Sequence, residues 1–249
     1  MNKKKIFIKI AVFVFWILIW QVLASAVDLE ILVPSPSSVF SVLANLVATV
    51  EFWQSIAFSL IRIVIGFLIA VILGIVLAII TGFVPYAYDI LSPVLNIIKA
   101  SPVASFIILL FLWFKSTYIP IITSFIMVLP MVWSNVYQSI RNIDPKILEM
   151  GKMFGFSRAK MLEFIYLPEC RKNFSSMLMV GVGFAWKAGI AAEVICNPSL
   201  SIGSNIYKSK IYLETPELFA WTIVVIILSI TVENILKIMV YGREVEGNK

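Results

Sequence analysis

Three ionisable residues, Arg62, Lys187 and Glu193, lie inside long apolar stretches of this 249-residue chain. A charged side chain inside an apolar span is costly, and such residues usually mark a path for a solute or an ion. A buried cation such as Lys187 would favour an anionic solute. We therefore treat these three residues as candidates for a translocation path.

Each candidate also has a structural interpretation that the sequence leaves open. The long side chain of Arg62 could extend so that its guanidinium group reaches the outer membrane–water interface. Lys187 could form an ion pair with another span. Glu193 suits a gate contact as well as a solute contact, and its six-residue offset from Lys187 turns it about 240° around a helix, so these two cannot pair. Glu233 and Lys237 have the i,i+4 spacing of a helical ion pair.

Most other chemistry is absent from the sequence. The chain has no histidine, and its cysteines, Cys170 and Cys196, do not form a C-x-x-C motif. No G-x4-G-K-[ST] phosphate-binding loop occurs, so ATP would have to be bound by another protein. We expect no metal and no cofactor on this chain, and a membrane enzyme is the weakest of the functional classes.

The composition is that of an integral membrane protein. Hydrophobic residues make up 61% of the chain and charged residues only 14%, against about 25% charged residues in soluble domains. Six apolar runs predict an all-α, six-span protein in a single domain, 1–249. The predicted spans are approximately 6–27, 56–80, 103–114, 118–137, 174–196 and 218–241. A cleaved signal peptide at Ala24-Ser25-Ala26 is an alternative for the first run, but that run is too long for a signal-peptide core.

The distribution of lysine and arginine predicts the orientation. With both termini cytoplasmic, fifteen of the 20 basic residues lie inside and three outside, and Arg62 and Lys187 lie within spans. The 81–102 connection, with Lys99, counts as inside. The longest loop, 139–173, carries seven of the inner charges.

The 139–173 loop predicts two short helices. Asp144 followed by Pro145 is a typical helix start, Gly155 suits the end of that helix, and Ser157 can cap a second helix. Pro168 is expected to end the second helix. The first helix is too short to be stable alone, so it needs either the bilayer surface or a partner protein to pack against.

Spacing in this loop resembles the "EAA" loop of ABC importer permeases. Glu149, Gly155, Ile165, Leu167 and Pro168 match the pattern E-A-A-x3-G-x9-I-x-L-P. The sequence departs from that pattern at Met150 and Gly151, which replace its two alanines. The resemblance implies that these seven residues form the loop that couples the permease to its ATPase.

Further segments resemble the nitrate/sulfonate/taurine type of permease, in the order found in that family. They are Val33-Pro34-Ser35-Pro36-Ser37, the Ser59 to Phe67 signature and Ala191-Ala192-Glu193. The resemblance implies a type I importer fold in the cytoplasmic (inner) membrane of a prokaryote. It also implies two ATPase subunits that use ATP and Mg²⁺, a second permease copy, an extracytoplasmic solute-binding protein and no nucleic acid. The alternative is a self-sufficient carrier or channel that uses Arg62, Lys187 and Glu193.

Overall fold

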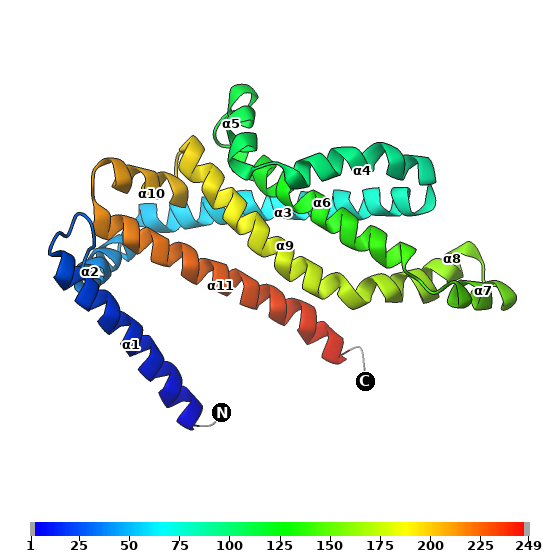
Figure 1. Ribbon diagram of the computed structural model, residues 1–249, viewed down its shortest axis with the longest axis horizontal. Helices are drawn as coiled ribbons and strands as arrows, with labels where there is room; N and C mark the ends of the chain where they lie inside the picture. Colours follow the sequence, from blue (N-terminus) through cyan, green and yellow to red (C-terminus); the bar gives the residue numbers. More distant parts are fainter. Residues whose placement is uncertain (1–2, 247–249) are drawn as a thin grey trace.

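The computed structural model describes residues 3–246, and every regular element in that range is a helix (Figure 1), which confirms the all-α expectation. The α-helices before the long loop are α1 (Lys3–Val27), α2 (Pro36–Val47), α3 (Val50–Phe83), α4 (Pro85–Ala100), α5 (Val103–Trp113) and α6 (Ile119–Arg141). The remaining elements are α7 (Pro145–Met153), α8 (Arg158–Met161), the π-helical turn η1 (Leu162–Tyr166), α9 (Leu167–Cys196), α10 (Ile202–Ile211) and α11 (Thr215–Glu246).

Five of these helices are long and apolar enough to cross a membrane, and the bent pair α4–α5 gives a sixth crossing if it is one span. The pair bends by 106° at Ser101 and Pro102. The sequence predicted a connection over 81–102, whereas the structure has a helix, α4, which runs back along α3 (Figure 1). Lys99 is therefore at the far end of a membrane helix, which reduces the predicted inner count of basic residues from fifteen to fourteen.

Helix α3 is the centre of the packing. It begins at Val50, six residues before the predicted start, and is capped by Thr49, whose hydroxyl accepts the N–H of Phe52 at 3.3 Å. Its ridge of small residues, from Gly66 through Ala70 and Gly74 to Ala78, is buried. A methyl group on Gly66 would overlap the backbone oxygen of Ile121 in α6. The small residues therefore allow α3 and α6 to pack at very short distance.

The prediction that Pro168 ends a helix is wrong. Residues 158–196 form one helical stretch, in which α8 continues through η1 into α9. In η1 the N–H of Leu167 bonds to the carbonyl oxygen of Leu162, five residues earlier. Pro168 then falls in the first turn of α9, where a residue without an N–H is tolerated. The long loop is thus continuous with a membrane span.

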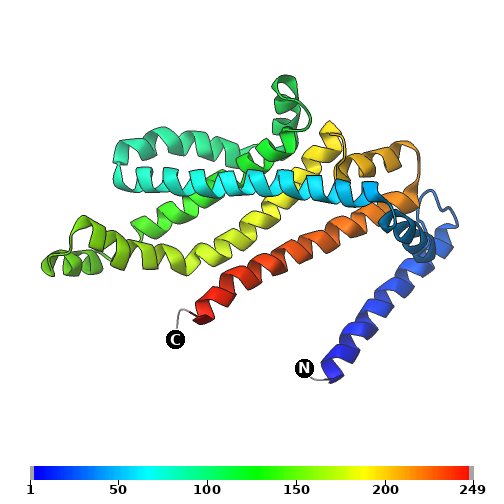
Figure 2. The ribbon, with the colours of Figure 1, turned by 180° about the vertical axis from the view of Figure 1, so that it is seen from behind.

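The elongated molecule has two distinct ends. Helices α7 and α8 lie at one end, and α2 and α10 lie at the other (Figures 1 and 2). Helix α1 stands apart from the bundle and is attached mainly near Trp20, whose indole N–H donates to the Pro34 oxygen at 3.0 Å and whose ring stacks on Phe219. Only 6% of the apolar stretch Ile10–Val27 of α1 is buried within the chain. Most of its surface is therefore available to lipid or to another chain.

Candidate functional site

The long loop folds as its capping residues predict. A side-chain oxygen of Asp144 accepts the N–H of Lys146 at 2.8 Å at the start of α7. Gly155 has a φ of 67°, the left-handed conformation that favours glycine, and Ser157 caps α8 by accepting the N–H of Lys160 at 3.3 Å. The first short helix and the bend at Gly155 are confirmed, whereas the second helix is not short, because it is the start of the continuous stretch 158–196.

Gly151 and Ile165 form the inner contact of this loop. Both are buried, and a methyl group on Gly151 would lie 2.6 Å from the sulfur of Met161 and 2.8 Å from the Cδ1 atom of Ile165. Glycine at this position therefore lets α7 lie directly on α8 and η1. Leu167 and Pro168 continue into α9 and are exposed. The close packing of α7 on α8 and η1 thus explains why glycine stands at position 151, where the EAA pattern has alanine.

The outer side of α7 presents apolar side chains and one free carboxylate. Met150 is 50% exposed, Met153 88% and Phe154 74%. Glu149 is also exposed, and the described residues offer it no hydrogen-bond or ion-pair partner. Large apolar side chains at the tip of a molecule are typical of an interaction site.

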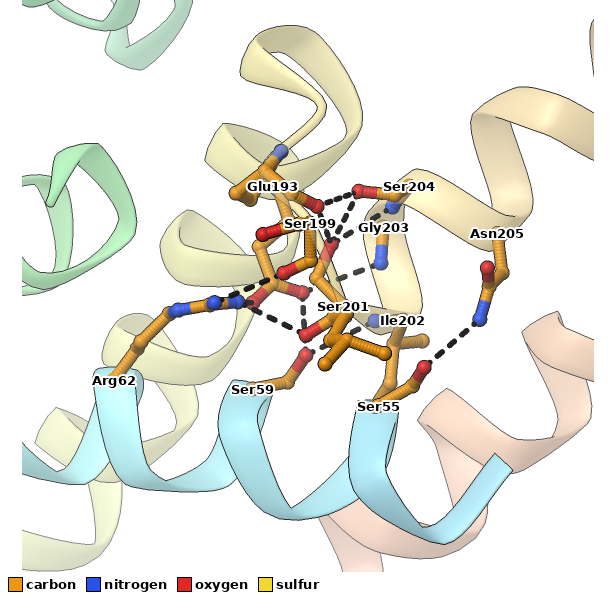
Figure 3. A network of polar contacts seen from close by, with 12 residues as sticks. Ser55, Ser59, Arg62, Glu193, Ser199, Ser201, Ile202, Gly203, Ser204 and Asn205 are labelled. Carbon is orange, nitrogen blue, oxygen red and sulfur yellow. Dashed lines mark hydrogen bonds and ion pairs between the residues drawn. The ribbon is translucent and has the colours of Figure 1, made fainter. Parts of the chain in front are cut away.

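A buried polar network (Figure 3) lies beside α10, at the opposite end of the bundle (Figure 1). Glu193 of α9 is fully buried and accepts hydrogen bonds from Ser59 at 2.7 Å and from the N–H of Gly203 at 3.2 Å. Arg62 of α3 is only 7% exposed and lies 3.5 Å from the other Glu193 oxygen. Arg62 therefore points into the protein and does not extend to the membrane interface.

The same network holds the loop between α9 and α10. Arg62 donates to the backbone oxygens of Ser199 at 3.0 Å and Leu200 at 3.2 Å. The Ser59 hydroxyl accepts the N–H of Ile202 at 3.0 Å. Leu200 has a φ of 49°, which is unfavourable for a leucine. Contacts to Arg62 and Ser59 thus fix a strained loop to α3.

Lys187 lies elsewhere, on the exposed face of α9. It lines a pocket of about 330 Å³ between α9 and α11, together with Met179, Val180, Gly183, Phe184 and Glu233. The structure therefore brings Arg62 and Glu193 together and leaves Lys187 apart from both.

The sequence did not predict Glu233 as a neighbour of Lys187. The expected ion pair between Glu233 and Lys237 is not formed in the described part of the chain. The meeting of Glu233 and Lys187 depends on how α9 crosses α11, which helical spacing within α11 does not reveal. Lys99 was also missed as an intramembrane cation, and its ammonium group lies 5.8 Å from the centre of the Trp133 ring.

Comparison with known proteins gives one consistent result. The family described as "Binding-protein-dependent transport system inner membrane component" matches residues 70–241. An aliphatic sulfonates transport permease protein of Escherichia coli (strain K12) is 33% identical over 205 residues, covering 79% of this chain and 75% of the relative. A taurine transport system permease protein of the same organism is 23% identical, covering 86% and 80%. An aliphatic sulfonates transport permease protein of Bacillus subtilis (strain 168) is also 23% identical, covering 90% and 81%.

Proposed function

The chain belongs to the family of binding-protein-dependent transport inner-membrane components, and we propose that it is the permease subunit of an ATP-driven importer, coupled to a separate ATPase through residues 144–168. The observation that carries this proposal is the exposed apolar surface of α7, formed by Met150, Met153 and Phe154. Glu149 adds a carboxylate for a basic group of the ATPase, which would bind the ATP and Mg²⁺.

The helix path supplies a physical means of coupling. Residues 158–196 are helical without a break, and α7 packs on the start of this stretch through Gly151 and Ile165. A displacement of α7 by the ATPase would therefore reach the middle of the membrane as a movement of α9. Lys187 lies on that same helix.

The network of Arg62 and Glu193 suits a different task in this mechanism. Both groups already have partners within the chain, so we assign them to holding the 197–201 loop beside the path. Lys187 has no such partner among the described residues and is exposed, and we assign it to the path itself.

The substrate and partners follow from the same proposal. We propose a small solute, probed first as an anion such as a sulfonate, since relatives are named for taurine and aliphatic sulfonates. A solute-binding protein would deliver it at the α2–α10 end. Two copies of this chain and two ATPase subunits would form the importer in the cytoplasmic membrane of a prokaryote, with both termini of each chain cytoplasmic.

Co-purification tests the coupling. A tagged chain, solubilised from its native host in mild detergent, should carry a stoichiometric ATPase subunit. Met153→Asp and Phe154→Asp should remove that subunit, because each places a charge in an apolar contact, while the amount of inserted chain stays the same. Tyr212→Asp is the matched control, since Tyr212 is 71% exposed at the opposite end.

A homo-oligomer that transports solute without any ATPase would contradict the proposal and favour the self-sufficient carrier. Equal ATPase recovery with wild type and both α7 variants would place the contact elsewhere on the chain.

A further inference from the structure

The pocket between α9 and α11 contains one positive and one negative side chain. Lys187 contributes an ammonium group from α9, and Glu233 contributes a carboxylate from α11. A methyl group on Gly183 would lie 3.5 Å from the Oε1 atom of Glu233, so this carboxylate lies beside Gly183. Lys187 follows Gly183 by four residues, which is about 6 Å along the helix.

Neither charge is neutralised within the described part of the chain. Among the residues that the structure describes, no hydrogen bond or ion pair involves Lys187 or Glu233, and Lys237 does not pair with Glu233. Arg62 and Glu193 differ in this respect, because each has several partners. Unpaired charges within membrane spans face a water-filled cavity or a ligand far more often than lipid.

We propose that Lys187 and Glu233 form a selectivity site for a small zwitterion, a solute with an acidic group and an ammonium group on a short carbon chain. This inference rests on the proposed transport function. Lys187 would bind the acidic group, and Glu233 would bind the ammonium group of the same molecule.

The balance of charge decides between a zwitterion and a simple anion. Lys187 alone would favour any anion, but Glu233 in the same pocket repels one. A zwitterion satisfies both side chains and leaves no net charge in the membrane. The apolar remainder of the pocket, including Val180 and Phe184, suits the connecting carbon atoms.

Charged thiol reagents test whether both side chains face water. Phe184, which is 53% exposed in this pocket, is replaced by cysteine in a chain whose Cys170 and Cys196 are serine. The sulfonatoethyl (anionic) and trimethylammonioethyl (cationic) methanethiosulfonates are then applied to the assembled importer. Lys187→Gln should slow the anionic reagent about fivefold, and Glu233→Gln should slow the cationic reagent about fivefold. Lys237→Gln, on the next turn of α11, should change neither rate.

Uptake tests the class of ligand. The importer in its native host is given 2-aminoethanesulfonate or ethanesulfonate, which differ only in the amine. Glu233→Gln should lower uptake of the amine compound about tenfold, and uptake of ethanesulfonate less than about twofold, since one charge-assisted hydrogen bond is lost. Lys187→Gln should lower uptake of both.

Three results would overturn the site. The thiol introduced by Phe184→Cys could react only with membrane-permeant reagents, which would show that the pocket faces lipid. The exchanged variant Lys187→Glu/Glu233→Lys could recover the losses of both single variants, which would show a structural ion pair. Wild type could carry ethanesulfonate in preference to the amine compound, which would exclude a site selective for zwitterions. The ATPase that co-purifies with each variant reports separately on the coupling proposal.

Discussion

The Ser59 hydroxyl joins three elements by donating to Glu193 and accepting the N–H of Ile202. Ser55, one turn earlier on α3 and equally buried, accepts a single hydrogen bond from the Asn205 side chain. These two serines, one helical turn apart, therefore differ in how many contacts they make. Ser59 links α3 to α9 and α10, and Ser55 links α3 to α10 alone.

Ser59→Ala should therefore destabilise the chain more than Ser55→Ala. The first change leaves the buried Ile202 N–H without an acceptor, at a cost of about 1–3 kcal/mol. The second change removes a donor–acceptor pair in which the Asn205 amide is only half-buried and can be hydrated. Thermal unfolding of the two variants in the same detergent measures the difference. Equal losses of stability would mean that the 197–201 loop is not held by Ser59.

At this scale the sequence predicted the geometry within a helix but not between helices. The turn of about 240° between Lys187 and Glu193 correctly separated the two residues. Nothing in the spacing revealed that Glu193 pairs with Arg62, 131 residues earlier, or that Glu233 lies beside Gly183. Such pairs depend on helix crossing angles, which the packing of the whole bundle determines.

Among the elements, apolar runs and capping residues predicted most helices, and proline was the main source of error. Helix α4 was missed because Asp89, Pro93 and Lys99 interrupt its apolar pattern, although tertiary contacts with α3 and α6 maintain it. Pro168 predicts a helix end, whereas the π-helical turn before it accommodates the missing N–H. A proline signals a local change in hydrogen bonding, which need not end a helix.

The contact between α3 and α6 provides a test with an internal control. A methyl group on Gly66 would overlap the Ile121 backbone oxygen, whereas one on Gly82 would meet only the Ile140 side chain, 3.0 Å from its Cγ2 atom. Gly66→Ala should force the helices apart and lower the apparent melting temperature by several degrees, as expected for an overpacked core that loses about 1–3 kcal/mol. Gly82→Ala should change it much less, because a side chain can move. Similar melting temperatures for both variants would contradict the close approach at Gly66.

At the scale of the whole molecule, the two proposed tasks, contact with the ATPase and solute handling, belong to different parts of its length. The polar network and the 197–201 loop lie at the α10 end, and the apolar surface of α7 lies at the other (Figures 1 and 2). Helix α9 connects them, and the pocket with Lys187 and Glu233 lies along it. An importer needs this arrangement, since solute arrives at one membrane face and ATP is used at the other.

The distribution of basic residues predicts which end of the molecule faces the cytoplasm. With Lys99 placed within a span, and with Lys249 outside the described residues, thirteen lysine and arginine residues are still on the α7 side and three on the α10 side, so the α7 end should be cytoplasmic. In a chain with Cys170 and Cys196 changed to serine, Tyr212→Cys should react with a membrane-impermeant maleimide in intact cells. Asn142→Cys, exposed beside α7, should react only after the cells are permeabilised. The opposite pattern would place α7 outside, beyond the reach of any cytoplasmic ATPase, and the coupling proposal would fail with it.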